Sequence, residues 1–180
     1  MPPFNLALSG KMCSGKTTAA NFAMSKLEKV EKISFSDPIY EIARKYFGMV
    51  EKDREILIWV GEKFRERDPK IWVKLLKQRV KDLNAQGVSV IIDDVRLPVE
   101  LEALHEVGFY TVRLNISPPE QEKRIRTLYP ETFQDHLAKR NHYTETALDD
   151  DSVQWNSYIA HDLRTDMIQN IISKIILRNV

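Results

Sequence analysis

Residues 4–17 of this 180-residue chain read FNLALSGKMCSGKT, and this stretch decides the fold. Phe4–Ser9 is a short, mostly apolar run, which is typical of a buried parallel strand. Gly10–Thr17 then fits the pattern G-x-x-x-x-G-K-[S/T] at every fixed position. Lys16–Lys29 follows with the apolar spacing of a helix. The order of strand, glycine-rich loop and helix is the context in which this pattern forms a phosphate-binding loop.

The spacing within this loop has a chemical reason. Glycine lets the backbone turn so that successive N–H groups point at phosphate oxygens, and the positive end of the next helix adds to the attraction. In this pattern Lys16 reaches the β- and γ-phosphates of a nucleotide, and the hydroxyl of Thr17 binds Mg²⁺. A glycine turn that only caps a helix is the structural alternative. The residues expected to contact ATP are Gly10, Ser14, Gly15, Lys16, Thr17 and Thr18.

Strand-like and helix-like segments alternate along the rest of the chain. Further strands are predicted at 31–36, 88–92, 109–115 and 157–161. Helices are predicted between them, beginning for example after Asp37-Pro38 and after Asp68-Pro69. This alternation predicts a central parallel sheet with helices on both faces. We therefore expect one domain over residues 1–180, with the three layers of an α/β/α sandwich.

Two segments interrupt the alternation and suit substrate binding. Residues 37–85 insert helices between two strands, as an acceptor-binding region would, and residues 121–146 are polar and cationic, as a lid would be. A lid excludes water from a phosphoryl-transfer site. The core of the domain is then expected at about 1–36, 86–120 and 152–180.

A second acidic position follows the most strand-like run, VSVII at 88–92. Asp93 and Asp94 emerge at the carboxyl end of that strand, where ligands bind in doubly wound sheets. One of them, for which we favour Asp94, would support Mg²⁺, and Arg96 would pair with a phosphoryl group. The structural alternative is an aspartate that caps the next helix and an Arg96 that makes an ordinary ion pair.

Cationic and aromatic side chains in the two segments complete the expected site, because arginine stabilises the charge of a transferring phosphoryl group. The candidates in the acceptor-binding region are Asp37, Arg44, Arg65, Arg67 and Trp72. Those in the lid are Lys123, Arg124, Arg126, Lys139 and Arg140. Each has a structural alternative: Asp37 as a helix cap, Trp72 as a core residue, and any single lid arginine as a solvated side chain.

Composition excludes several classes of protein. With 27 Lys and Arg against 26 Asp and Glu, the net charge of +1 gives no bulk attraction to nucleic acid. The single cysteine, Cys13, excludes an internal disulfide framework and fits a reducing compartment, and its variable position in the loop predicts no catalytic role. No apolar run reaches the roughly 18–20 residues of a membrane span, and no signal peptide is evident. We expect a cytoplasmic protein with no membrane partner.

Five segments of the chain resemble the deoxynucleoside monophosphate kinases of the phage type. They are SGKMCSGKTT, SFSDPIYEIARKYFG, GEKFRERDPKIW, IIDDVRLPVE and HYTETALDD, and the resemblance covers about residues 4–175. Related animal phosphomevalonate kinases share the phosphate-binding loop, a G-E-x-x-R-x-x-D-P segment and a D-x-R segment. The block formed by Asp94, Val95, Arg96, Pro98 and Glu100 is the most specific to the phage-type group.

The resemblance implies a P-loop kinase fold and ATP-dependent phosphorylation of a deoxynucleoside monophosphate to its diphosphate. It implies that Lys16 and Thr17 serve ATP and Mg²⁺ and that Asp94 supports the metal. It also implies that Arg96 and Arg65 face the acceptor phosphate or the transferring group.

For the remaining candidates, the resemblance implies that Asp37 lines the acceptor pocket and that Trp72 lies near the base. Arg124 and Arg126 resemble catalytic lid arginines. One departure is clear: the family tends to read D-P-L-K where this chain has Asp37-Pro38-Ile39-Tyr40. A lysine that would touch the substrate phosphate is missing, so Arg44 or Lys45 takes that role, or the acceptor differs.

Other functions stay open at this point. A kinase for another small molecule, such as phosphomevalonate or dephospho-coenzyme A, is the first alternative. A polynucleotide 5′-end kinase would need a basic channel with stacking aromatic side chains, and a non-catalytic nucleotide-binding regulator is the last alternative. We expect a small-molecule substrate, no stable nucleic-acid partner, and a monomer or homodimer. His142 and Glu145 receive no chemical role, and the acidic run Asp149–Asp151 is expected to be a solvated turn.

Overall fold

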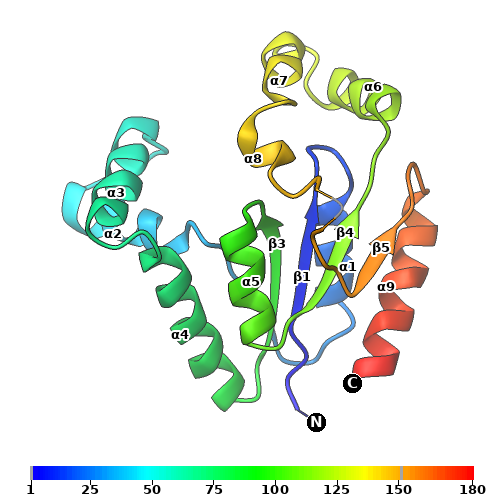
Figure 1. Cartoon of the computed structure of the whole chain (residues 1–180), viewed down its shortest axis with the longest axis horizontal. Coiled ribbons are helices and arrows are strands. Elements are labelled where there is room, and N and C mark those ends of the chain that lie inside the picture. The colour runs from blue at the N-terminus through cyan, green and yellow to red at the C-terminus, as the bar shows by residue number, and fades with distance from the viewer. Residues whose placement is uncertain (1, 151) are drawn as a thin grey trace.

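A computed structural model describes residues 2–150 and 152–180 of the chain. In this part of the chain, five parallel strands form one sheet in the order β2-β3-β1-β4-β5 (Figure 1). The strands are β1 (Leu6–Gly10), β2 (Val30–Lys32), β3 (Ser89–Val95), β4 (Tyr110–Leu114) and β5 (Ser157–Ile159). Because parallel neighbours need crossover connections, helices must lie on the faces of this sheet.

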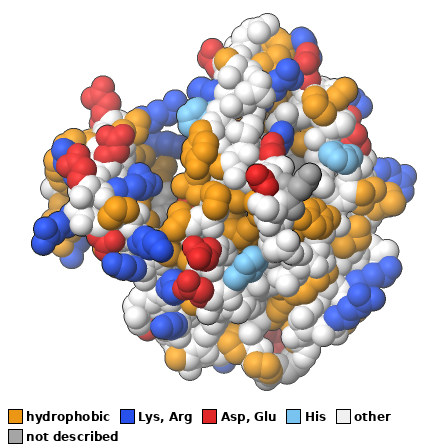
Figure 2. All heavy atoms as spheres, in the orientation of Figure 1, with side chains coloured by type: hydrophobic (Ala, Val, Ile, Leu, Met, Phe, Trp, Pro, Cys, Tyr) orange, Lys and Arg blue, Asp and Glu red, His pale blue; other side chains and the backbone are white. Residues whose placement is uncertain are grey.

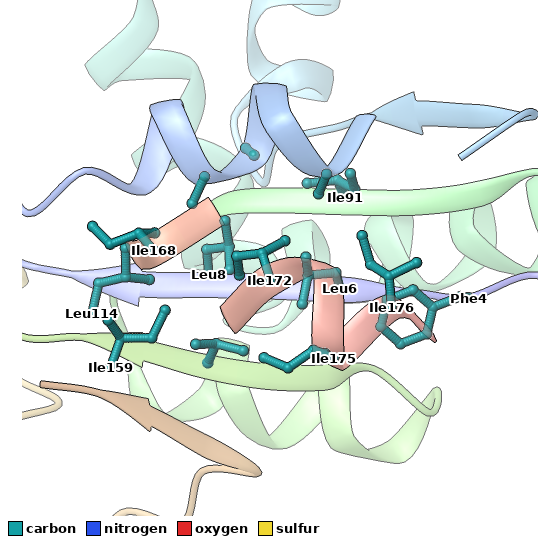
Figure 3. Close-up of a cluster of buried hydrophobic side chains, with 14 residues drawn as sticks. Phe4, Leu6, Leu8, Ile91, Leu114, Ile159, Ile168, Ile172, Ile175 and Ile176 are labelled. Atoms are coloured by element: carbon teal, nitrogen blue, oxygen red, sulfur yellow. The ribbon is translucent and has the colours of Figure 1, made fainter. Parts of the chain in front are cut away.

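Helices cover both faces, which confirms the predicted three-layer α/β/α sandwich. Helices α1 (Lys16–Met24) and α9 (Thr165–Asn179) lie on one face, where Leu8 packs with Ile172 in a buried cluster (Figure 3). Helices α4 (Ile71–Ala85) and α5 (Pro98–Glu106) cover the other face, where Ile92 and Leu104 are fully buried. The two central strands β1 and β3 are mostly buried, which explains why most of their residues are apolar.

Five further helices extend beyond the sandwich. Helices α2 (Asp37–Phe47) and α3 (Arg54–Arg67) stand to one side of it, past the sheet edge formed by β2 (Figure 1). Helices α6 (Pro118–Leu128), α7 (Phe133–Lys139) and α8 (Tyr143–Thr146) lie over the carboxyl ends of the strands (Figure 1). The polar segment predicted as a lid therefore folds into three short helices above the edge where ligands bind in such sheets.

Two elements are shorter than predicted, in each case because a side chain bonds to the backbone. Strand β2 ends at Lys32, since the carboxylate of Asp37 accepts the N–H of Ser34 at 2.7 Å and turns the chain toward α2. Helix α1 ends at Met24, where the hydroxyl of Ser25 donates to Phe22 O at 2.7 Å. Such local bonds compete with the regular ladder of a strand or helix. Across residues 2–150 and 152–180, no helix is both long enough and apolar enough to cross a membrane.

Candidate phosphate-binding site

The loop Gly10–Thr17 leaves the carboxyl end of β1 and runs into α1. Its two fixed glycines each have a steric reason. A Cβ at Gly10 would collide with the carbonyl oxygen of Leu114 and with Ser14 Oγ, and Gly15 has a φ of 96°, in the left-handed region. Only glycine adopts both conformations without strain. The pattern read from the sequence therefore corresponds to a real constraint on the backbone.

Lys16 folds back over this loop. Its Nζ donates to Gly10 O at 2.7 Å and to Lys11 O at 2.8 Å. Burial, helped by the positive charge of Arg96, lowers the pKa of Lys16 to about 8. A phosphate group would favour the charged ammonium, because an opposite charge nearby stabilises it. Thr17 and Thr18 follow at the start of α1 and are exposed.

The structure extends β3 to Val95, so that it includes Asp93 and Asp94, and it distinguishes the two aspartates. Asp93 is paired with Lys32 at 2.6 Å. Asp94 accepts from Ser34 through Oδ2, while its Oδ1 is buried without a hydrogen-bond partner, as is Ser14 Oγ of the loop. Burial raises the pKa of Asp94. Buried polar atoms are nearly always paired, so these two oxygens fit a site for a bound cation or phosphate group.

Arg96 is fixed at both of its ends. Its backbone N–H donates to Glu100 Oε2 at 2.8 Å, and the same oxygen accepts the N–H of Leu97 at 3.0 Å. Burial raises the pKa of Glu100 to about 7. The guanidinium of Arg96 forms an ion pair with Glu145 of α8. Arg96 is therefore held at the carboxyl end of β3, beside the phosphate-binding loop.

Only one of the two predicted lid arginines faces the loop. Arg124 donates through Nη1 to Cys13 O at 3.1 Å and through Nε to Glu120 at 2.9 Å. Arg126 instead pairs with Glu122 at 2.7 Å and lies over the ring of Phe133, 3.9 Å from its centroid. Residues two apart on a helix point in different directions, which is why both cannot face the loop. Arg126 therefore lies outside the site in this structure.

Two lid residues that sequence reasoning left without a role, or did not consider, bind the loop directly. Glu145 Oε2 accepts the N–H of Met12 at 2.7 Å. Gln121 Nε2 donates to the carbonyl oxygen of Met12 at 3.1 Å. The HYTE block was a usable signal for Glu145, because a carboxylate stands there in a segment that resembles a known family. Gln121 sits in a polar helix with no distinguishing pattern, so no signal marked it.

The acidic run after the lid is not simply a solvated turn. Asp149 forms ion pairs with Lys11 at 2.8 Å and with Arg113 at 2.6 Å. Lys11 belongs to the loop and Arg113 to β4, so Asp149 ties the two together. Asp149 is exposed, as expected of a solvated turn, but it also pairs with cations from distant segments, which the sequence did not predict. Asp151, the last residue of the run, lies outside the described residues.

Two cavities lie near these groups. One, of about 770 Å³, runs along the loop and is lined by α1, α6 and the start of α9, with Lys16, Thr17 and Arg124 among its walls. The other, of about 650 Å³, lies between α2 and α4 and includes Asp37 and Arg44. In the space-filling view a hollow separates the α2–α3 unit from the lid, with Lys and Arg side chains visible beside it (Figure 2).

The predicted acceptor residues do not all come together. Asp37 and Arg44 line the same cavity, and the Arg44 guanidinium lies over the ring of Tyr40, 5.5 Å from its centroid. Arg65 is exposed on α3. Trp72 is buried, and its Nε1 donates to Gly61 O at 3.2 Å, which places the indole in the core. Trp72 is therefore a core residue in this structure, as its structural alternative stated.

Residues 6–146 match the family model described as an AAA domain. The chain belongs to the AAA-domain family. A curated relative, the uncharacterised protein ORF77 of Ictalurid herpesvirus 1 (strain Auburn), is 34% identical over 149 residues, which are 81% of this chain. The chain spans 59% of the length of that relative.

Solved structures of kinases share the fold of this AAA-domain protein. The APS kinase of Mycobacterium tuberculosis, in complex with AMPPNP and APS, is 10% identical, with a TM-score of 0.60 over 98% of each chain. The thymidylate kinase of Candida albicans is 16% identical, with a TM-score of 0.59 over 99% of this chain and 92% of its own. At these identities the likeness concerns the fold, which is that of a P-loop kinase.

The geometry of this AAA-domain site suits a polyanion. Lys16 from α1 and Arg124 from α6 bond to the backbone of the loop, and Arg96 after β3 reaches it through Glu145. Cations held in advance around one loop stabilise phosphate charge without reorganising during a reaction. Asp94 adds an oxygen ligand of the kind that Mg²⁺ prefers.

Proposed function

We propose that this protein transfers the γ-phosphoryl group of ATP to a deoxynucleoside monophosphate and so forms the diphosphate. The observation that carries the proposal is the convergence of Lys16, Arg96 and Arg124, from three separate elements, on one phosphate-binding loop beside a cavity of about 770 Å³. The choice of a deoxynucleotide as acceptor rests on the resemblance carried by Asp94, Arg96 and the residues around them.

The reaction is an in-line displacement. An oxygen of the acceptor phosphate attacks the γ-phosphorus of ATP and forms the new P–O bond, while the bond from that phosphorus to the β–γ bridging oxygen breaks and ADP leaves. No covalent enzyme intermediate is required. Lys16, Arg96 and Arg124 hold the phosphates in place and offset the charge on the transferring group.

Thr17 and Asp94 are the residues that would hold Mg²⁺. The buried, unpartnered Oδ1 of Asp94 and the hydroxyl of Thr17 at the start of α1 are oxygen donors, which Mg²⁺ prefers together with substrate phosphates. When bound, Mg²⁺ neutralises phosphate charge and orients the leaving group.

A small-molecule kinase with a different acceptor, such as phosphomevalonate or dephospho-coenzyme A, is the second candidate. The specific observation in its favour is on the acceptor side. Trp72 is buried, Arg65 is exposed, and Tyr40 stands where the phage-type family tends to have lysine. A pocket built differently from that of the family would select a different acceptor.

An ADP-release assay over a panel of acceptors separates the candidates. We expect turnover with one or more deoxynucleoside monophosphates, and less with ribonucleotides, phosphomevalonate or dephospho-coenzyme A. The Lys16→Ala variant is the negative control for contaminating kinases. Turnover with phosphomevalonate and with no nucleotide would refute the nucleotide proposal, and release of ADP without any acceptor dependence would refute a kinase.

A further inference from the structure

Glu145 occupies an unusual position at the end of the lid. It belongs to the four-residue helix α8 and is 8% exposed. One of its carboxylate oxygens accepts the N–H of Met12 at 2.7 Å, and the other pairs with the guanidinium of Arg96. A buried carboxylate is stable only where it is paired and hydrogen-bonded, so these two donors account for its burial.

Other lid side chains hold the same part of the loop from α6. Gln121 donates to the carbonyl oxygen of Met12 at 3.1 Å, and Arg124 donates to that of Cys13 at 3.1 Å. The N–H of Met12 is therefore hydrogen-bonded to α8, and its C=O is hydrogen-bonded to α6. Because each peptide is planar, fixing a carbonyl also fixes the direction of the N–H that follows it. The lid thus determines the orientation of three successive peptides in the loop, from Lys11–Met12 to Cys13–Ser14.

Arg96 depends on Glu145 for the position of its charged end. Its backbone is set by Glu100, but its side chain is 41% exposed and would otherwise be free to change rotamer. A long, mobile arginine loses conformational entropy when a reaction requires one geometry. A side chain that is already held by a charge-assisted bond avoids most of that loss at the moment of reaction.

We infer that Glu145 is a positioning residue, which holds the Arg96 guanidinium and the Met12 amide in the arrangement that phosphoryl transfer uses and so links closure of the lid to the loop. The inference rests on the proposed function, because it gives Arg96 a part in that transfer. Glu145 acts through Arg96 and the loop, with no contact to substrate assigned to it.

A double-mutant cycle tests this inference. Wild type, Glu145→Gln, Arg96→Gln and the double variant are compared for kcat and for KM with ATP. We expect Glu145→Gln to lower kcat by about 10-fold to 100-fold and to change the KM for ATP by less than about threefold. The loss of kcat is smaller than the roughly 100-fold to 1,000-fold for a donor that contacts the reacting group, because Glu145 acts through Arg96. In the Arg96→Gln background, the second substitution is expected to lower kcat by a clearly smaller factor than in wild type, since the Arg96 partner is already gone and only the contact with Met12 is left to lose.

Glu122→Gln is the matched control. Glu122 is also a lid carboxylate paired with arginine, but its partners are Arg126 and Arg140, away from the loop. We expect this variant to keep the kcat of the wild type. Equal melting temperatures for wild type, Glu145→Gln and Glu122→Gln would exclude a general loss of folding.

Three results would overturn the inference. The first is an unchanged kcat for Glu145→Gln. The second is a double variant whose loss is the product of the two single losses, since the residues would then act independently. The third is tighter ATP binding by Glu145→Gln with unchanged kcat, because Glu145 would then only occupy the place of a phosphate group.

A measurement without substrate separates this inference from the proposed function. The exchange rate of the Met12 amide proton is compared by NMR among the nucleotide-free proteins. We expect exchange about tenfold faster in Glu145→Gln than in wild type and unchanged in Glu122→Gln, because a neutral amide is a weaker acceptor than a carboxylate. If the wild type phosphorylates no acceptor, the proposed function fails and this measurement still tests the contact. Equal exchange in wild type and Glu145→Gln would refute the inference whatever the acceptor.

Discussion

The loop region and the α2–α3 unit use their charged side chains in different ways. Around the loop, charges bind partners from distant segments, as Glu145 does with Met12 and Arg113 with Asp149. On the α2–α3 unit the charged contacts are local and exposed, such as Lys63 with Glu66 one helical turn away. Exposed local pairs contribute little to stability, whereas buried ones fix the geometry of a site at some cost in desolvation.

The charged side chains around the loop are therefore held in place more firmly than those of the α2–α3 unit. The phosphate side has its donors in place before any ligand binds. The acceptor side presents Arg65 exposed and Arg44 on a cavity wall, and neither position alone defines a ligand. Under the proposed function, the residues for phosphoryl transfer are therefore more strictly fixed than those for the choice of acceptor.

Removal of the loop lysine gives the largest expected loss. Lys16→Ala is expected to lower kcat at least about a hundredfold to a thousandfold, because it deletes a charged donor held over the loop. Thermal unfolding should change little, since Gly10 and Lys11 are both partly exposed and water can hydrate their freed carbonyls. Steady-state kinetics and a melting curve check both points. A variant that keeps most of its activity would contradict the assignment of the loop.

Burial on the phosphate side should also appear as a pH effect on stability. The pKa of Glu100 is about 7 in the folded protein, above its usual 4.5, so the folded state binds a proton more tightly than the unfolded state. The free energy of unfolding should therefore fall as pH rises from about 4.5 to 7, by at most about 3 kcal/mol. In Glu100→Gln, most of this decrease in the free energy of unfolding with rising pH should be absent.

Urea unfolding at pH 5 and pH 8 measures the effect, with Glu106→Gln as the control on the same helix. The ion pair with Lys77 lowers the pKa of Glu106, so its carboxylate stabilises the protein at neutral pH. The free energy of unfolding of Glu106→Gln at pH 8 should therefore be no higher than that of wild type. An identical pH dependence for wild type and Glu100→Gln would show that the pKa of this carboxyl is not raised.

The two lid arginines provide a comparison within one helix. Arg124→Ala is expected to weaken ATP binding about tenfold, because Arg124 lines the cavity and contacts the loop, which corresponds to about 1.4 kcal/mol. Arg126→Ala should change it by less than about twofold, since its contacts are Glu122 and Phe133. Titration of a fluorescent ATP analogue checks the pair. Equal losses would mean that the lid rearranges when nucleotide binds.

On the acceptor side we expect an effect of Trp72 on stability but none on the binding of the acceptor. Trp72→Phe should lower the free energy of unfolding by about 1–2 kcal/mol, because Gly61 O loses its donor in a buried place. Its KM for the acceptor should stay unchanged. Trp59→Phe, at an exposed indole of α3, is the control and should leave stability within about 0.5 kcal/mol. A raised acceptor KM for Trp72→Phe would place the indole at the base after all.

Local pattern was enough to predict the layers of the fold and the loop. The first strand, the glycines and the lysine are contiguous within residues 4–17. The strand VSVII can likewise be recognised without long-range information. The short length of β2 could not be predicted, since it depends on how the Asp37 carboxylate bonds to Ser34.

The unpredicted part of the site is held by tertiary contacts. Glu145 and Gln121 meet Met12 across sequence separations of 133 and 109 residues, which no periodicity records. The same limit applies to Trp72, whose apolar spacing on α4 fitted both a core residue and a pocket residue. Its hydrogen bond to Gly61, from another helix, is visible only in the folded chain.

The two hydrogen bonds that the lid makes to Met12 also affect how a ligand would enter and leave the site. A flap hinged on one side opens by swinging its free end, but both ends of this lid are attached to the loop, through Gln121 and through Glu145. Between them, α7 has no buried side chain. The lid is therefore attached to the loop at two points, with its least buried helix between them. Under the proposed function, release of ADP would limit the rate of turnover only if one of these two contacts with Met12 must break first.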